Sequence, residues 1–398
     1  MNRKLKLAVF NTQPPHLYFG GVERRIIETA KLLVNEVDTT VYSGTKKGFN
    51  KTTVINGTTF VPCFSTDKLY PLDNWVFNRT LSGMIDTIKA DIYEAHTVSG
   101  YGFLKVLKKR KISKPFINTI HGVLADEYIQ SSKSVSPSLR MKLSNVFMKH
   151  LARIEKKAAR EATLIVTVSR YSAQKIVQLY DVEETKIRIV PNGVNPQKFK
   201  PTEDCKKVKH LIGLNGEQVI LFVGNLIPRK GLHFLIEAAK QVIKEFKETK
   251  FVVVGDGPLK NHLISYSKEQ GVSDNFVFLG DVTEDMLHRL YNCADVFASP
   301  SIQEGQGISL LEAQATAKPV VAFNVTAINE IVKNNETGLL VKPDSHELAN
   351  AILSLLSDKP LREKMGRSGR EFVSKNFSWN ICAQKMLQIY SEASENLV

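Results

Sequence analysis

The chain has 398 residues, of which 43% are hydrophobic and 24% charged, and a chain of this length and composition forms two or three globular domains. Its 23 glycines and 15 prolines are close to the average for soluble proteins, which excludes collagen-like, low-complexity and disordered chains. The net charge of +14 is confined to the first half: residues 1–200 hold 32 Lys and Arg against 16 Asp and Glu, whereas residues 201–398 hold 22 against 24.

The first half begins an alternating series of strands and helices. An apolar run at Leu5–Asn11 predicts a strand, Gly20-Gly21 predicts a turn, and the apolar spacing from about residue 22 to 34 predicts a helix. Further strands are predicted at residues 38–42, 92–95, 116–120, 164–168 and 187–190. This alternation favours a parallel sheet covered by helices on both faces.

A second series follows a segment rich in turn residues. Residues 191–205 contain three prolines and Asn192-Gly193, which predicts a hinge between domains. After it, strands are predicted at 219–224, 250–255, 275–279, 296–299 and 319–323, and helices at 232–246, 259–270, 286–294, 309–317 and 345–356. We therefore expect an α/β fold with two tandem Rossmann-like domains facing a central cleft, where the carboxyl ends of the strands would bind a ligand.

Cysteine spacing and apolar runs bear on the cellular location. Cys63, Cys205, Cys293 and Cys382 form no C-x-x-C pair, so neither a zinc site nor a disulfide framework is indicated. The longest apolar runs are far shorter than the roughly 18 residues of a membrane-spanning helix, and no cleavage site follows the basic first residues. We expect a cytoplasmic protein with reduced cysteines and no metal.

Two strand-to-helix connections carry features of an anion site. Gly20 and Gly21 let a ligand approach the backbone at a helix start, although a simple tight turn explains them equally well. In the second domain, Arg229 and Lys230 precede a predicted helix, where carboxylates are normally preferred. A bound diphosphate would explain the two cations, and the alternative is an exposed Arg-Lys pair on a loop.

A third connection carries two carboxylates around a glycine. Glu304 lies in a turn after a predicted strand, Gly307 precedes the next helix, and Glu312 falls on that helix. A carboxylate can accept hydrogen bonds from two sugar hydroxyls, and the amides of a helix start can bind phosphate. The alternative interpretation makes Glu304 a turn residue and Glu312 a surface charge.

Together these motifs resemble the retaining glycosyltransferases of family 4, which have the two-Rossmann GT-B fold. The resemblance implies an acceptor-binding domain at residues 1–195, a donor-binding domain at 206–376, and a C-terminal helix at 377–398 that crosses back to the first domain. It covers nearly the whole chain and rests on residues 20–24, 119–122, 168–170, 191–194, 229–231, 255–258, 304–312 and 377–379.

The resemblance also implies roles for single residues. Arg229 and Lys230 would hold the donor diphosphate, Glu304 and His121 would contact sugar hydroxyls, and Glu312 would contact the ribose. The remaining donor contacts would be Gly20, Gly21, Asn225, Val282, Gly307 and Ile308. Two positions depart from the family pattern, since Asn225 replaces a common arginine and Gln306 replaces an aromatic residue, and the second change bears on donor-sugar identity.

The implied reaction moves a sugar from a nucleotide diphosphate sugar, a UDP-sugar rather than a GDP-sugar, to an acceptor hydroxyl with retention and without metal or other cofactor. The acceptor would be a glycan or a lipid-linked glycan, in glycolipid, lipopolysaccharide or other cell-surface glycan synthesis. Two alternatives remain open: a non-hydrolysing sugar-nucleotide epimerase of the same fold, and an inactive GT-B module that binds anionic lipid.

A basic segment indicates a further partner. Residues 101–160 hold 14 basic and 3 acidic side chains, and residues 138–161 predict an amphipathic helix with a basic face. We expect this surface to hold the cytoplasmic protein peripherally on an anionic membrane, and the alternative is a core-packing helix with a solvated basic side. Few aromatic residues lie there to stack on bases, so nucleic acid is not expected. The expected apolar face consists of Leu139, Leu143, Val146, Phe147, Leu151, Ile154 and Ala158.

Overall fold

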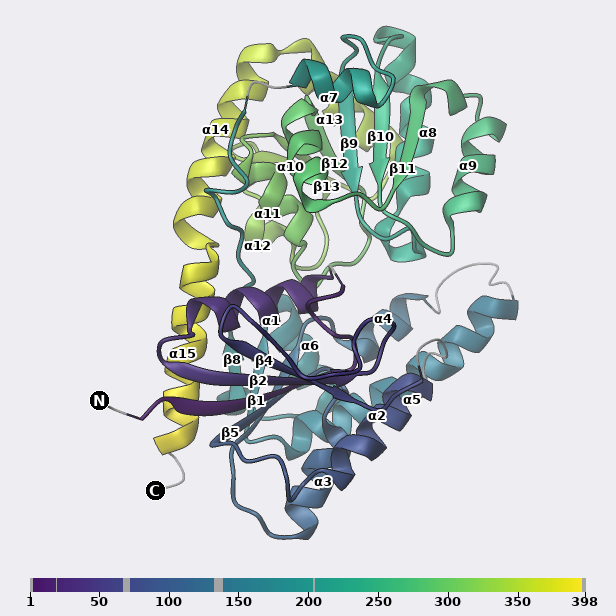
Figure 1. Ribbon diagram of the computed structural model, residues 1–398. Helices are drawn as coiled ribbons and strands as arrows, with labels where there is room; N and C mark the ends of the chain where they lie inside the picture. Colours follow the sequence, from purple (N-terminus) through teal and green to yellow (C-terminus); the bar gives the residue numbers. More distant parts are fainter. Residues whose placement is uncertain (1–2, 19, 67–71, 132–138, 203–204, 396–398) are drawn as a thin grey trace. The chain divides into compact units, whose positions relative to one another are not determined.

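The computed structural model describes residues 3–18, 20–66, 72–131, 139–202 and 205–395. The chain forms two compact units, of which unit 1 comprises Met1–Asn192 with Trp379–Val398 and unit 2 comprises Gly193–Ser378. Each unit is a Rossmann-like α/β domain built on a parallel sheet, which confirms the predicted fold class (Figure 1). The last helix packs within unit 1.

Unit 1 contains an eight-stranded sheet in the order β3-β4-β2-β1-β5-β6-β7-β8. All neighbouring strands are parallel except β3 and β4, which form a hairpin through Asn56-Gly57 with positive φ at both residues. The strands are β1 Leu5–Asn11, β2 Val37–Gly44, β3 Thr53–Ile55, β4 Thr58–Cys63, β5 Ile92–His96, β6 Phe116–Ile120, β7 Leu164–Thr167 and β8 Ile187–Ile189. The helices are α1 Gly21–Leu32, α2 Leu72–Gly83, α3 Tyr101–Lys109, α4 Leu124–Ser131, α5 Leu139–Glu161, α6 Arg170–Tyr180 and α15 Trp379–Glu395.

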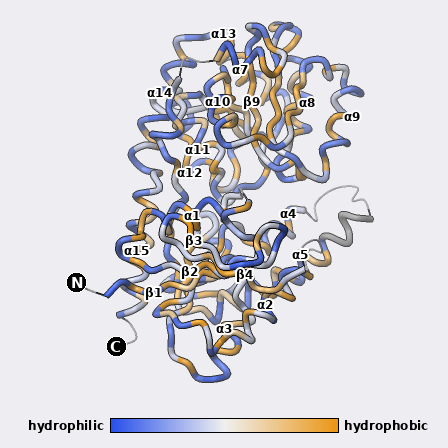
Figure 2. Tube along the Cα trace, in the orientation of Figure 1, coloured by the Kyte–Doolittle hydropathy of each residue, from blue (hydrophilic) through white to orange (hydrophobic). Residues whose placement is uncertain are grey.

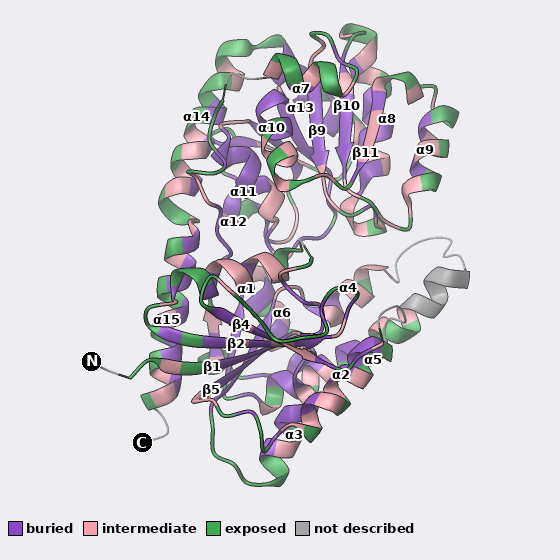
Figure 3. Cartoon of the chain, in the orientation of Figure 1, coloured by how far each residue is buried: buried purple, intermediate pink, exposed green. Residues whose placement is uncertain are grey.

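Helices cover the sheet of unit 1 on more than one side. Ala8 and Phe10 of β1 face a cluster with Phe77 of α2 and Phe103 of α3, and the Phe10 and Phe103 rings lie 4.9 Å apart. On another side α1 and α15 pack against each other, although they lie at opposite ends of the chain (Figure 1). Figure 3 shows the strands between these layers as buried.

Unit 2 contains a six-stranded parallel sheet in the order β11-β10-β9-β12-β13-β14. Alternate residues of β9 serve opposite faces: Ile220 and Phe222 pack with α8 and α13, whereas Val219 and Leu221 pack with α10 and α11. Figure 2 shows this concentration of hydrophobic residues along β9. The strands are β9 Val219–Val223, β10 Lys250–Val254, β11 Phe276–Gly280, β12 Val296–Ser299, β13 Val320–Phe323 and β14 Gly338–Val341. The helices are α7 Cys205–Leu211, α8 Leu232–Glu245, α9 Lys260–Glu269, α10 Glu284–Cys293, α11 Ile308–Ala315, α12 Ile328–Ile331, α13 Ser345–Ser357 and α14 Lys359–Asn376.

One carboxyl group joins three helices inside unit 1. Glu155 of α5 is fully buried, and its Oε2 accepts hydrogen bonds from the Leu124 amide, at 2.9 Å, and from the Tyr180 hydroxyl. Its Oε1 has no hydrogen-bond partner among the described residues. Burial raises the pKa of Glu155 to about 8, because its hydrogen bonds only partly offset the loss of water.

We expect Glu155→Gln to stabilise the protein at alkaline pH. Between about pH 4.5 and pH 8, Glu155 keeps its proton in the folded state and releases it in the unfolded state. The stability that neutral Glu155 contributes is therefore complete below about pH 4.5 and is lost as the pH rises to about 8. Glutamine stays neutral and avoids this loss, which approaches ~5 kcal/mol. Urea unfolding should show little difference between variant and wild type at pH 5 and a higher midpoint for the variant at pH 8. The exposed Glu184→Gln is the control, and an equal effect there would contradict the assignment.

Candidate active site

The site in unit 2 lies where the strand order of its sheet reverses. β9 and β12 are neighbours at this point, and their connections lead in opposite directions across the sheet. The loop after β9 ends in the short helix Pro228–Lys230, and the loop after β12 leads to α11. Ligands of open α/β sheets bind at such switch points, beyond the carboxyl ends of the strands.

These two loops bring three of the predicted residues into contact. Lys230 forms an ion pair with Glu304, and Arg229 Nη1 lies 3.5 Å from Glu304 Oε2. Arg229 also donates a hydrogen bond to the Gln303 carbonyl at 3.2 Å, and the Ser301 hydroxyl donates one to Glu304 Oε1 at 2.9 Å. We call Arg229, Lys230 and Glu304 the charged cluster.

Charge balance in the charged cluster keeps Glu304 ionised. Burial by itself would raise the pKa of this carboxyl, which is only 5% exposed, but Lys230 and Arg229 outweigh that effect and hold the pKa below its ordinary value. The Lys230 and Arg229 side chains are 14% and 30% exposed, so they are not a solvated pair on a loop. Glu304 thus supplies part of the negative charge that balances Arg229 and Lys230, whereas the interpretation of the sequence had assigned all of it to a diphosphate.

Gly231 allows the two loops to approach each other. Its φ is +64°, and a Cβ at this position would lie 2.0 Å from the Pro300 carbonyl oxygen. The Ile302 amide donates a hydrogen bond to the Arg229 carbonyl at 2.9 Å, which closes the contact from the other side. Only glycine fits here, and its close approach places Lys230 beside Glu304.

The helix after Glu304 carries the second predicted carboxylate. Gly307, with φ of +94°, immediately precedes Ile308, the first residue of α11, and no described side chain caps this helix start. Glu312 is 3% exposed and accepts a hydrogen bond from the Tyr291 hydroxyl at 2.8 Å. The alternative interpretation of Glu312 as a surface charge is therefore wrong.

Two further predicted donor contacts follow strands of the same sheet. Asn225 is exposed just after β9, and Val282 is half-buried just after β11, where it packs against the core. Both lie at the carboxyl edge of the sheet, as the charged cluster does. The topology of the sheet places them near this edge, and the direct contacts described above join Arg229, Lys230 and Glu304.

In unit 1, Gly20 and Gly21 lie at the start of α1. The carboxylate of Glu23 reaches back over this start, since a Cβ at Gly20 would lie 2.1 Å from Glu23 Oε2. Asn11 donates a hydrogen bond to Glu23 Oε1 at 3.3 Å, and burial raises the pKa of Glu23. The sequence prediction missed this residue, although an acidic side chain in a first helical turn is a common signal.

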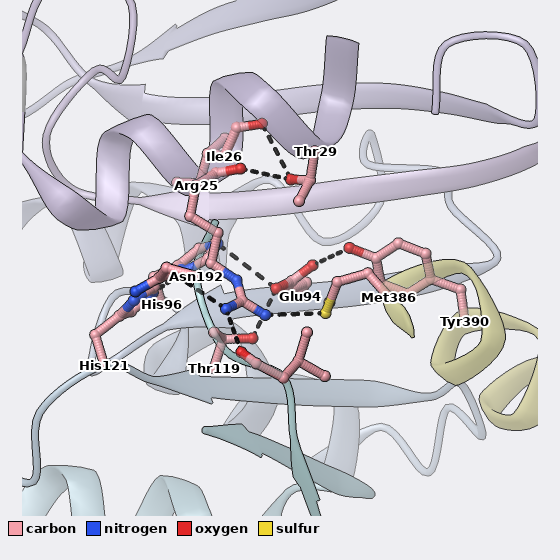
Figure 4. A network of polar contacts seen from close by, with 11 residues as sticks. Arg25, Ile26, Thr29, Glu94, His96, Thr119, His121, Asn192, Met386 and Tyr390 are labelled. Atoms are coloured by element: carbon pink, nitrogen blue, oxygen red, sulfur yellow. Dashed lines mark hydrogen bonds and ion pairs between the residues drawn. The ribbon is translucent and has the colours of Figure 1, made fainter. Parts of the chain in front are cut away.

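His121 follows β6 and belongs to a buried polar network (Figure 4). Its Nε2 lies 2.9 Å from Nδ1 of His96, and His96 Nε2 lies 3.6 Å from Oε1 of Glu94. Arg25, which is 1% exposed, donates hydrogen bonds to the Val190 carbonyl at 2.7 Å and to Asn192 Oδ1 at 3.1 Å.

Apart from His121, the members of this network were missed by the sequence prediction. Glu94 and His96 alternate along β5, in a strand whose other residues are apolar, and this pattern was the available signal. Burial lowers the pKa of His96 to about 4 and that of His121 well below its ordinary value, and Arg25 contributes to both shifts. Both imidazoles are neutral at physiological pH.

The described residues include no group of three or more His, Cys, Asp or Glu side chains with the spacing of a metal site. The four cysteines are free thiols. None of the described helices is long and apolar enough to cross a bilayer.

Two family models match the chain. Residues 19–198 match the model described as Glycosyltransferase Family 4, and residues 207–372 match the model described as Glycosyl transferases group 1. An uncharacterized glycosyltransferase of Methanocaldococcus jannaschii is 31% identical over 322 residues, which is 79% of this chain and 78% of that protein.

A second relative and a solved structure extend this comparison. A UDP-Gal:α-D-GlcNAc-diphosphoundecaprenol α-1,3-galactosyltransferase of Escherichia coli is 28% identical over 315 residues, 77% of each chain. The Anabaena protein HepE, solved in complex with UDP-glucose, superposes with a TM-score of 0.78 over 98% of this chain and 100% of its own, at 20% identity. This structural likeness shows the fold.

Proposed function

The chain belongs to the family 4, group 1 glycosyltransferases, and on that basis we propose that it transfers a hexose from a UDP-sugar to a hydroxyl of a lipid-linked glycan acceptor. The observation that carries the donor assignment is the charged cluster at the switch point of unit 2. UDP is preferred over GDP because the E. coli relative, whose name gives UDP-Gal as donor, matches 77% of this chain, whereas a GDP-mannose-dependent mannosyltransferase of Mycobacterium tuberculosis, 31% identical, matches 57%. The diphosphoundecaprenol in the name of that same relative supports a lipid-linked acceptor.

The proposed leaving-group chemistry uses the two cations. As the bond between sugar and diphosphate breaks, negative charge grows on the phosphate oxygens, and Arg229 and Lys230 would stabilise it from fixed positions. The amides at the start of α11, beside Gly307 and Ile308, would add a favourable dipole. No metal ion is needed in this proposal.

The carboxylates would orient the donor. Glu304 already holds both cations in place and has acceptor capacity for sugar hydroxyls, whereas Glu312 on α11 would bind the ribose. Asn225, Val282, Gly20 and Gly21 would supply the remaining contacts. The acceptor hydroxyl would attack the face that the diphosphate leaves, with retention, and pass its proton to a phosphate oxygen.

A panel of sugar nucleotides tests the proposal. We would incubate the protein with UDP- and GDP-sugars, with and without membrane extract, and measure nucleotide release. Acceptor-dependent UDP release supports the proposed function, and NMR of the product gives the anomeric configuration. Isomerisation without acceptor would indicate an epimerase, and neither reaction would indicate a binding module.

Chelation of divalent metals should leave activity largely unchanged. The reason is that Arg229 and Lys230 take the place of a metal ion at the diphosphate. The measurement is the initial rate with and without EDTA, after the protein has been passed through a chelating resin. Complete loss of activity, restored by magnesium or manganese, would overturn the proposed leaving-group chemistry.

The surface of α5 supports a membrane-associated acceptor. Lys149, Arg153 and Lys157 are exposed, and they share the exposed surface of α5 with two apolar side chains, Val146 at 64% and Phe147 at 40%. Exposed apolar side chains among basic ones are typical of helices that lie in a membrane interface. The proposal is that this surface binds anionic lipid.

The predicted apolar face of α5 is divided between two environments. Leu151 and Ala158 are buried, as in the core-packing alternative, whereas Val146 and Phe147 are exposed, because the helix packs against α4, α3 and α6 over only part of its length. The side chains of residues 139–144 lie outside the described residues. Two basic side chains also have a structural role, since Lys156 and Arg160 donate hydrogen bonds to the last carbonyls of α6.

Replacing Lys149, Arg153 and Lys157 together by glutamine should weaken liposome binding by at least tenfold at low salt. Each basic side chain near an anionic surface contributes roughly 1 kcal/mol, and salt screens this attraction within about 10 Å. Co-sedimentation with liposomes of graded phosphatidylserine content measures the effect. Glutamine at the exposed Lys206, Lys207 and Lys244 of unit 2 is the matched control. If the wild-type protein does not bind anionic liposomes, the exposed surface of α5 has a function other than lipid binding.

A further inference from the structure

A line of buried polar side chains in unit 1 leads from α15 to His121 (Figure 4). The Tyr390 hydroxyl donates a hydrogen bond to Oε2 of Glu94, and the Thr119 hydroxyl donates one to Oε1 at 2.6 Å. His96 lies between this carboxylate and His121. The whole path is inside unit 1, with contributions from β5, β6, the loop after β6, and α15.

The partners of His96 determine which of its nitrogens carries the proton. Nε2 faces the Glu94 carboxylate at 3.6 Å, and an N–H there is attracted to the carboxylate whereas a lone pair is repelled. A neutral imidazole has one N–H, so His96 Nδ1 is then an acceptor. The nearest partner of that acceptor is His121 Nε2, at 2.9 Å.

The same argument then applies to His121. Its Nε2 must donate to His96 Nδ1, so the proton of the neutral ring lies on Nε2 and Nδ1 carries a lone pair. This Nδ1 is buried and has no hydrogen-bond partner among the described residues. An acceptor that is left unpaired in a buried place costs free energy until a donor group reaches it.

Double protonation, which would turn either nitrogen into a donor, is disfavoured at both rings. His96 is buried, His121 is half-buried with its Nδ1 enclosed, and the guanidinium of Arg25 lies in the same network and opposes additional positive charge. Arg25 is itself held by the Val190 carbonyl and Asn192 and contacts Met386 Sδ at 3.1 Å. The network therefore holds one positive charge in a fixed place and keeps the two rings neutral.

We propose that Glu94 and His96 are positioning residues that hold His121 in the ring form whose Nδ1 accepts a hydrogen bond from a hydroxyl of the donor sugar. Tyr390, from the end of the chain, anchors Glu94. This inference rests on the proposed function for the identity of the hydroxyl. The ring forms themselves follow from unit 1 alone and can be measured without any donor.

The first experiment measures the ring forms directly. The full chain labelled with 15N-histidine is studied by NMR at pH 7.5 without ligand, and the ring signals are assigned by their loss in His121→Gln and His96→Asn. We expect protonated Nε2 and unprotonated Nδ1 for both rings. A proton on His121 Nδ1 would overturn the proposal, whether or not the protein proves to be a glycosyltransferase.

The second experiment compares two substitutions of His96. The Oδ1 of asparagine takes nearly the place of His96 Nδ1, so His96→Asn should keep the His121 ring form. Leucine offers no acceptor, so His96→Leu should release His121 into a mixture of ring forms. With the sugar nucleotide that wild type accepts, we expect His96→Leu to raise the donor KM roughly tenfold and to change kcat little, and His96→Asn to stay within about threefold of wild type.

A set of monodeoxy donors separates positioning from general loss of structure. Wild type and His96→Asn should discriminate roughly tenfold against the one donor that lacks the hydroxyl bound by His121, and His96→Leu should lose that discrimination. Thr167→Val is the structural control, because it removes the buried hydrogen bond to the Ile120 carbonyl, at 2.9 Å, beside His121. It should lower stability and keep the discrimination. If His96→Leu weakens all donors equally, His96 has only a structural role and the proposal fails.

Discussion

Replacing Lys230 by alanine is expected to lower turnover by at least ~100-fold, the usual loss when one fixed charge-stabilising contact to a transition state is removed. The variant loses the ion pair with Glu304 and one of the two cations proposed to stabilise the leaving diphosphate. Glu304 remains buried, with Arg229 at 3.5 Å and the Ser301 hydroxyl still beside it. The variant should therefore also lose stability, because a buried carboxylate without its close cation is costly. Initial rates and the thermal midpoint measure both effects.

Two further variants make the interpretation unambiguous. In Lys230→Ala/Glu304→Gln the buried charge is gone, so the thermal midpoint should recover while turnover stays low. Lys260→Ala removes a more exposed lysine of the same unit, paired with Asp256 at 2.7 Å, and should change neither quantity much. Turnover of folded Lys230→Ala within tenfold of wild type would contradict the placement of the diphosphate at the charged cluster.

Gly231→Ala should combine a large loss of stability with a large loss of activity. The added Cβ would meet the Pro300 carbonyl oxygen at 2.0 Å, and the φ of +64° is unfavourable for alanine. Backbone strain and the forced separation of the two loops together should cost about 3 kcal/mol or more. A displacement of Lys230 by about 1 Å is enough to lower the rate by roughly 100-fold.

Gly213→Ala is a matched control for this substitution. Gly213 also has positive φ, +78°, but nothing lies within 4 Å of the position of an added Cβ. This variant should show the conformational cost alone, about 1 kcal/mol, with normal turnover. Equal thermal midpoints for the two alanine variants would show that the contact with Pro300 is not needed to hold the loops together.

The sheets were largely predictable because strands that are buried on both faces appear in the sequence as short apolar runs between turn residues. The predictions for β1, β6 and β12 were correct to the residue, and the other predicted strands differed by one or two residues at their ends. The hairpin of β3 and β4 was missed although Asn56-Gly57 is a strong turn signal. α14 was also missed, since Gly366 and Gly369 lie in it where the chain passes close to Ala317 and Gln314.

The sequence indicated which charged residues at the ends of strands would lie together, but it did not indicate which polar groups meet in the interior. Arg229, Lys230 and Glu304 occupy loops after strands, where sequence position alone indicates a shared edge. Glu94 and Tyr390 are 296 residues apart in the sequence, and their contact depends on where α15 packs. No local pattern contains that information.

The return of α15 to unit 1 has a consequence for how the protein is made. Residues Gly193–Ser378 form one uninterrupted unit, so a chain emerging from the ribosome presents all of unit 2 before α15 exists. Until then three side chains of the first unit lack their partners on α15. Glu94 lacks Tyr390, Arg25 lacks Met386, and Arg188 lacks Glu392. Synthesis of unit 2 is therefore complete before that of unit 1, and the interior of unit 1 can close only once α15 has been made.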